Sequence, residues 1–170
     1  MDVRKENEPT PTKNHTTVER ISDREVLVTR TINGPARLVF EAWTTPELVK
    51  KWWVPKSMPM KLVTCEIDLR AGGRYRYVFE SPSFEAFGKF IEVTPCSRLV
   101  WTNEDQPDGE HAISTATFEE KGGRTLVSLH EVHATKEALD AALSSGAIEG
   151  TRATLEQLEE FVSDFAASAS

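Results

Sequence analysis

Proton transfer has one candidate pair within a predicted core strand of this sequence, His130 and Glu131, since a histidine beside a carboxylate can pass protons at neutral pH. Neighbouring strand residues point to opposite faces, so the two side chains cannot serve one substrate without a bulge. Whichever faces inward is expected to be the main polar residue of a pocket, with a pKa shifted by burial. A structural hydrogen bond is the alternative. His130 and His133 also differ in face, which argues against a metal site.

Aromatic side chains offer a second kind of chemistry, the binding of an apolar molecule. Tyr75, Tyr77 and Phe79 alternate along one strand and share a face, as do Leu99 and Trp101 on another. Such faces line a pocket, pack against a helix, or do both. A phenolic hydroxyl in an apolar pocket needs a partner, so Tyr75 and Tyr77 are expected to fix a polar group of a ligand.

Other reactive patterns are missing from the sequence. It has no Gly-x-Ser-x-Gly elbow, phosphate loop, dinucleotide fingerprint or His-Glu-x-x-His run, so we predict neither a metal nor a cofactor. Cys65 lies on the apolar face of a strand and is expected to be a packed thiol, while Cys96 follows a proline in a turn. Asp68 and Arg70 share a face beside two glycines, which favours an ion pair that ties a hairpin.

The elements that would position these residues follow from periodicity and turn signals. A strand is predicted over residues 25–32, followed by a helix that begins at Pro35 and a short helix over residues 46–53. Six more strands are predicted over residues 61–69, 74–80, 84–93, 98–102, 113–119 and 125–133. A short helix over residues 136–143 precedes a final helix. The final helix has an apolar stripe made of Ile148, Thr151, Leu155, Leu158, Val162 and Phe165.

The order β-α-α-β6-α predicts an α+β fold, in which a curved seven-stranded antiparallel sheet grips the long C-terminal helix. Such a sheet touches its helix closely at one end and can stand away at the other, which leaves a cavity. Residues 1–20 are polar and are expected to be a flexible tail, with a single domain over residues 21–167.

Composition restricts the partners and the location. The 170 residues include 27 acidic and 20 basic ones, so the net charge is −7 and nucleic acid is an unexpected partner. No stretch approaches the ~20 apolar residues of a membrane span, and the N-terminus lacks the apolar core of a secretory signal. Together with the two cysteines, which are expected to be reduced thiols, these features favour a cytoplasmic protein, and a monomer and a homodimer both stay open.

Several segments carry a family resemblance when taken in order. They are I-x-x-P-A-x-x-V-F-x-A-W-T-x-P-E from Ile32, K-W-W-x-P from Lys51, D-L-R-x-G-G from Asp68, G-K-F-x-E-V-x-P-x-x-R-L-V-W-T from Gly88, and T-L-V from Thr125. The chain thereby resembles activator-of-heat-shock-protein-90-ATPase homologue-like proteins, within the START and birch-pollen-allergen-like (SRPBCC) superfamily. The resemblance implies a helix-grip fold around an apolar ligand pocket. Many relatives carry Gly-Trp where this chain has Gly150-Thr151, so no role of that tryptophan is transferred.

The residues and the resemblance together favour the binding of a hydrophobic small molecule between the sheet and the last helix. The pocket candidates are Trp43, Trp53, Tyr75, Tyr77, Phe79, Trp101, His130, Glu131, Thr151 and Leu155. Two alternatives stay open: a co-chaperone-like module with a chaperone as protein partner, and a cyclase or hydrolase that uses Glu131, His130, Tyr75 or Tyr77. No catalytic residue is assigned.

Overall fold

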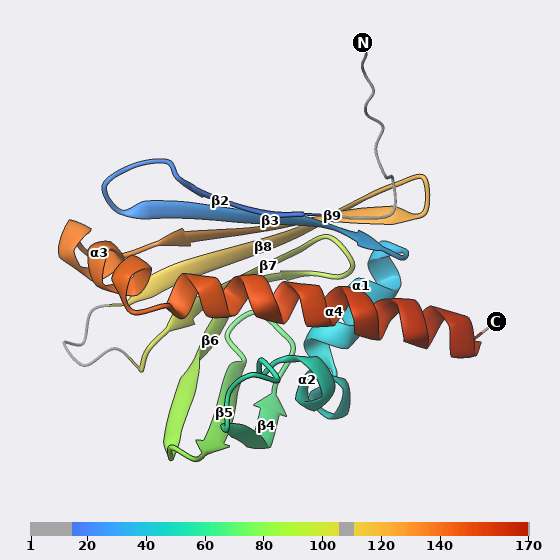
Figure 1. Ribbon diagram of the computed structural model, residues 1–170, viewed down its shortest axis with the longest axis horizontal. Helices are drawn as coiled ribbons and strands as arrows, with labels where there is room; N and C mark the ends of the chain where they lie inside the picture. Colours follow the sequence, from blue (N-terminus) through green and yellow to red (C-terminus); the bar gives the residue numbers. More distant parts are fainter. Residues whose placement is uncertain (1–14, 106–110, 170) are drawn as a thin grey trace, which may run out of the picture.

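A computed structural model describes residues 15–105 and 111–169. The described elements are a single antiparallel sheet and four helices, with the long C-terminal helix lying across the sheet (Figure 1). In chain order they are β2 (Thr16–Arg20), β3 (Glu25–Asn33), α1 (Ala36–Thr44), α2 (Pro46–Trp52), β4 (Lys61–Ile67), β5 (Arg74–Glu80), β6 (Phe84–Thr94), β7 (Arg98–Asn103), β8 (Ala112–Lys121), β9 (Arg124–Val132), α3 (Lys136–Ser144) and α4 (Ala147–Ala169).

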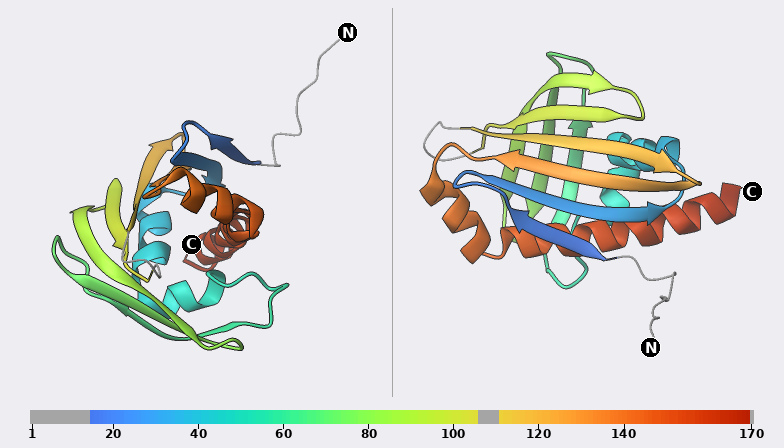
Figure 2. Two further views of the ribbon diagram at one scale, coloured as in Figure 1. Left: turned by 90° about the vertical axis from the view of Figure 1, so that its left-hand side faces the viewer. Right: turned by 90° about the horizontal axis from the view of Figure 1, so that it is seen from above.

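The strands follow the order β2-β3-β9-β8-β7-β6-β5-β4. Seen along α4, the sheet bends around the helix, with β4, β5 and β6 turned toward α2 (Figure 2, left). A register shift between Phe90 and Glu92 marks an irregularity in β6 beside β7, of the kind that bends a sheet. The α+β helix-grip architecture predicted from the sequence is therefore confirmed.

The predicted count of seven strands is wrong by one, because β2 lies within the segment expected to be a flexible tail. Thr16 pairs with Arg30 of β3, and the pairing continues to Arg20 opposite Val26. Arg30 also donates from Nη1 to the Thr16 hydroxyl at 2.9 Å. This strand was missed because backbone pairing and polar contacts hold it, whereas the sequence argument counted apolar residues. Residues 1–14 of the expected tail lie outside the described part of the chain.

The core lies between the concave face of the sheet and one side of α4. Val26, Val28 and Ile32 of β3 are almost fully buried, as their alternation predicts. On α4, Leu158 and Val162 have no exposed surface, and at 2.7 Å Glu159 accepts from Arg30, so this half of the helix is fixed by packing and by charge. Within the described residues, no helix is both long and apolar enough to cross a bilayer.

Hydrogen bonds tie the two short helices to each other and to α4. The Trp52 indole donates to the Ala42 carbonyl at 3.0 Å, which joins α2 to α1. From α4, Thr154 donates to the Trp53 carbonyl at 3.0 Å, and the Gln157 amide donates to the Trp52 and Val54 carbonyls at 2.9 and 2.8 Å. The segment that ends α2 is thus held at a fixed distance from α4.

Smaller sequence expectations also have clear outcomes. Both Cys65 and Cys96 are free thiols, the first buried and the second exposed. Arg70 donates to both carboxylate oxygens of Asp68 at 3.1 and 3.0 Å. This pair is exposed at the turn before β5 and is far more accessible than a ligand-binding pair would be, which agrees with a role in the turn.

Candidate ligand-binding cleft

A cleft opens between the concave face of the sheet and the N-terminal half of α4. It consists of an inner lobe of about 70 Å³ and an outer lobe of about 470 Å³. The two lobes share five lining residues, Trp43, Trp53, Ala86, Trp101 and Asn103, so they adjoin each other. The outer lobe is bounded by the end of α2 on one side and by residues 145–155 of the α3–α4 turn and α4 on the other.

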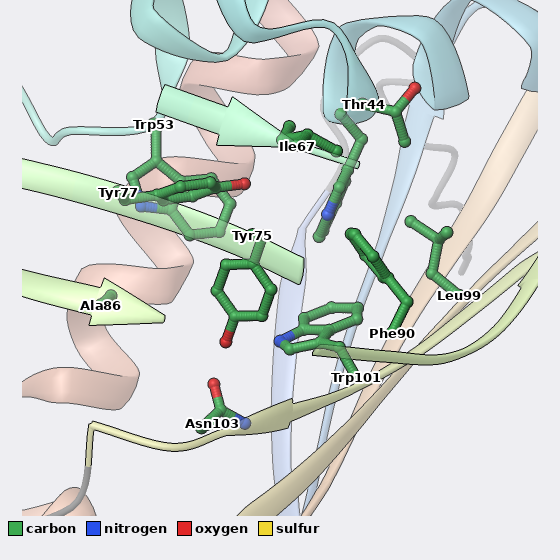
Figure 3. A pocket seen from close by; sticks show the side chains of 11 residues that line it. Thr44, Trp53, Ile67, Tyr75, Tyr77, Ala86, Phe90, Leu99, Trp101 and Asn103 are labelled. Carbon is green, nitrogen blue, oxygen red and sulfur yellow. The ribbon is translucent and has the colours of Figure 1, made fainter. Parts of the chain in front are cut away.

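Aromatic rings form most of the wall of the inner lobe. Trp43 of α1 lies 6.5 Å from Trp101 of β7 and 6.2 Å from Trp53, measured between ring centroids. Tyr77 meets Trp53 edge to face at 5.2 Å, and Tyr75 contacts Tyr77 at 5.6 Å. These rings come from α1, from the residue that follows α2 and from two strands, so the tertiary fold alone brings them together (Figure 3).

Tyr75 and Asn103 supply polar atoms at one end of the inner lobe. The Tyr75 hydroxyl donates to the Thr102 carbonyl at 2.7 Å, and burial raises the pKa of Tyr75. Its cross-strand partner is Gly88, where a Cβ would overlap the same carbonyl oxygen, so the close approach of β6 to β7 requires glycine. The Tyr75 hydroxyl and the Asn103 amide are turned toward each other in Figure 3.

Tyr77 differs from Tyr75 because its hydroxyl makes no hydrogen bond with the described residues. The side chain is 7% exposed, and burial raises the pKa of Tyr77 well above its ordinary value. A buried phenol without a partner costs free energy that a bound polar group would recover. Tyr77 is therefore the side chain of the inner lobe with the most to gain from a ligand.

The outer lobe has a row of polar side chains across three strands. Ser114 of β8 is paired with Trp101 of β7 on one side and with Glu131 of β9 on the other, so the three side chains share the concave face. Asn103 donates to Ser114 Oγ at 3.0 Å. Oε1 of Glu131 and Nε2 of His133 form a hydrogen bond at 3.2 Å. Polar groups thus gather at the end of the cleft nearest the α3–α4 turn.

Nine of the ten pocket residues predicted from the sequence line one or both lobes. They are Trp43, Trp53, Tyr75, Tyr77, Phe79, Trp101, Glu131, Thr151 and Leu155. His130 is the exception, because Glu131 faces inward and its neighbour must then face outward. His130 Nε2 is bonded to Glu25 at 2.9 Å, outside the cleft.

Several lining residues were not identified from the sequence. Asn103 and Ser114 lie at the ends of their predicted strands, where a one-residue error in the boundary hides the face of a side chain. Thr154 lies one turn beyond Gly150 on α4 but outside the apolar stripe. A signal did exist for Asn103, since it follows Trp101 by two residues and shares its face.

The structure shows the burial of the Cys65 thiol and the arrangement of possible metal ligands within residues 15–105 and 111–169. Burial raises the pKa of the Cys65 thiol to about 11, so it is not a ready nucleophile. Among the residues that the structure describes, no group of three or more His, Cys, Asp or Glu side chains gathers as a metal site would require. The arrangement is suited to enclosing an apolar molecule and to orienting it through a few polar atoms.

The residues that line the cleft lie within the part of the chain that matches a known protein family. Residues 33–163 match the family described as activator of Hsp90 ATPase homolog 1-like protein, and every lining residue falls inside that range. The chain belongs to this family. The family shares the START and birch-pollen-allergen-like (SRPBCC) helix-grip fold, which is known for ligand binding in a cavity.

Solved structures are similar over almost their whole length. A protein of Nitrosomonas europaea is 30% identical, with a TM-score of 0.76, and the match covers 86% of this chain and 98% of that one. A protein of Rhodobacter sphaeroides is 19% identical, with a TM-score of 0.80 and coverage of 88% and 99%, a likeness that shows the fold alone. A search of curated proteins found no match to this chain.

Proposed function

We propose that this protein binds a hydrophobic small molecule in the cleft between the concave face of the sheet and the N-terminal half of α4. The observation that carries the proposal is the aromatic-walled cleft itself, an inner lobe that adjoins a larger outer lobe. Burial of apolar ligand surface contributes about 25 cal/mol per Å² before the cost of association. Such a molecule would extend from the inner lobe into the outer one.

The size of the lobes limits the shape of the ligand. The inner lobe, at about 70 Å³, is smaller than the ~150 Å³ cavity that accommodates benzene in an engineered core. It therefore admits the end of a chain or the edge of a ring. The outer lobe, at about 470 Å³, is large enough for the remainder of a lipid-like molecule.

Titration with the neutral fluorescent probe N-phenyl-1-naphthylamine tests the proposal. We expect saturable binding with one site per chain and displacement by 1-octanol. Thr151 lines the outer lobe, so Thr151→Trp should fill it and weaken probe binding by tenfold or more. Thr117 is on β8 but outside both lobes, and Thr117→Trp is the matched control. Unchanged binding by folded Thr151→Trp would contradict the proposal.

A co-chaperone role is the second candidate, and the family description is what favours it. Met58 and Phe84 at the rim of the outer lobe are 46% and 43% exposed, which suits contact with another protein. The ATPase rate of a heat-shock-protein-90 chaperone, measured with and without this protein, tests that role. An unchanged rate together with probe binding would leave the ligand-binding function alone.

A further inference from the structure

Glu131 is the only residue with a formal charge among the described residues that line the two lobes. Its side chain is 21% exposed and lies on the concave face, beside Ser114 and across it from Trp101. A carboxylate in a mostly apolar cleft is costly unless a charge or hydrogen bonds compensate for its lost hydration. Glu131 is hydrogen-bonded to His133, whose Nε2 lies 3.2 Å from Oε1 of the carboxylate.

Most of the neighbouring polar groups offer hydrogen-bond acceptors. Asn103 uses its Nδ2 to donate to the Ala112 carbonyl at 3.1 Å and to Ser114 Oγ at 3.0 Å, which fixes the amide and leaves its oxygen as the available atom. Thr151 donates its hydroxyl proton to the Ala147 carbonyl at 3.3 Å, and the hydroxyl of Thr154 has the carbonyls of Gly150 at 2.9 Å and Trp53 at 3.0 Å within reach, so the oxygens of both threonines are acceptors too. Only the Ser114 hydroxyl, which accepts from Asn103, keeps a proton to donate, so a ligand group that donates several hydrogen bonds suits this site best.

From this arrangement we infer that the ligand is an amphiphile with a protonated amine, whose ammonium group binds Glu131 while its apolar part extends over Trp101 toward the inner lobe. The inference rests on the proposed function and names the chemical class of its ligand. An ammonium group supplies a positive charge and up to three hydrogen-bond donors. Neither an alcohol nor a carboxylate provides both.

The charged side chains near Tyr75 do not reverse the preference for an ammonium group. Glu104 lies beside Tyr75 and is paired with Arg74 at 3.0 Å, while Asp105 is also close enough to affect Tyr75. Two acidic groups and one basic group therefore lie near the Tyr75 side chain. The alternative role of Glu131 is structural, in which its bond to His133 ties the end of β9 and no ligand is involved.

Three probes of equal chain length separate these possibilities: octylamine, 1-octanol and octanoate, each measured at about pH 8 by calorimetry and by displacement of N-phenyl-1-naphthylamine. The amine stays protonated at this pH. We expect octylamine to bind at least tenfold more tightly than 1-octanol, and octanoate to bind most weakly. This comparison uses the unaltered protein, so it does not depend on any variant folding.

Substitution of the carboxylate tests the assignment to Glu131. Glu131→Gln keeps the size and the acceptor oxygen that meets His133, and it should reduce the amine preference to within threefold while leaving 1-octanol unchanged. Glu119, exposed on β8 and outside the cleft, gives the matched control Glu119→Gln, which should keep the full preference. Melting temperatures confirm that both variants are folded.

The binding and melting results distinguish the amine inference, the proposed function and a purely structural role of Glu131. Equal affinity for octylamine and 1-octanol, or an amine preference that survives Glu131→Gln, would overturn the amine inference and leave the proposed function standing. Failure of all three probes to bind would overturn the proposed function as well. A lower melting temperature of Glu131→Gln with an unchanged preference would assign Glu131 to structure alone.

Discussion

The two halves of α4 face different surroundings although they belong to one continuous helix. In the C-terminal half, Leu158 and Val162 are fully buried and Glu159 meets Arg30 of β3. In the N-terminal half, Gly150 and Thr151 face the outer lobe of the cleft. The N-terminal half still buries Ile148 and Leu155 against the core, so one helix can both hold the fold together and, through its neighbouring residues, bound a cavity.

Loss of a side chain from the C-terminal half of α4 should have the largest effect on stability. Leu158→Ala removes a fully buried side chain between α4 and the sheet, and such changes cost about 2–5 kcal/mol. Thr151→Ala in the N-terminal half removes a hydroxyl bonded within its own helix and one methyl group beside the cleft, and we expect a change below about 0.5 kcal/mol. Urea unfolding measures both, and equal losses would contradict the comparison.

Two glycines sharpen the contrast by predicted effects of opposite sign. A Cβ at Gly34 would lie 2.5 Å from Val162 Cγ1, so Gly34→Ala should cost about 1–3 kcal/mol. A Cβ at Gly150 meets nothing within 4 Å, and Gly150→Ala should stabilise the helix by about 1 kcal/mol. Thermal melts of the two variants check the signs. If Gly150→Ala is instead destabilised, the surface of α4 at Gly150 is packed.

The two tyrosines of the inner lobe should also respond in opposite directions. Tyr75→Phe removes the donor to the Thr102 carbonyl and should cost about 1 kcal/mol. Tyr77→Phe removes a buried hydroxyl without a partner and should leave stability unchanged or raise it by about 1 kcal/mol. Denaturant midpoints compare them. If Tyr77→Phe is the more damaging change, its hydroxyl has a partner in solution.

The smallest effect is expected outside the cleft, at His130. Its hydrogen bond to Glu25 lowers the pKa of that carboxyl below the ordinary 4.5. A lowered pKa in the folded state stabilises the fold above the unfolded value, and this contribution is lost as the pH falls through the folded value. His130→Ala should therefore reduce acid sensitivity below about pH 4.5 and leave probe affinity unchanged, as pH-dependent melts and titrations would show.

Most of the architecture could be predicted from residue patterns with a strong period. The alternation in β3 and the three- and four-residue spacing along α4 identify their buried faces directly, because burial selects apolar side chains. The strand β2 escaped prediction because an edge strand needs backbone partners more than apolar residues, and its contact with Arg30 depends on residues distant in sequence. The local sequence pattern does not show which distant segments pair in the sheet.

The aromatic part of the cleft was predictable for a similar reason, whereas its polar part was not. Tyr75, Tyr77 and Trp101 lie on faces that alternation reveals. The sequence limited His130 and Glu131 to opposite faces but could not decide which one points inward, because that depends on the register with β8 and β3. The partnership of Asn103 with Ser114 across two strands also requires the register.

The hydrogen bonds that Thr154 and Gln157 make with the backbone at the end of α2 have an evolutionary consequence. These bonds use carbonyl oxygens, so they do not depend on which side chains residues 53 and 54 carry. Substitutions that reshape the cleft can therefore accumulate on the first turns of α4 and after α2 while the backbone hydrogen bonds remain. Members of this family can differ in the shape of the cleft without first losing their shared scaffold.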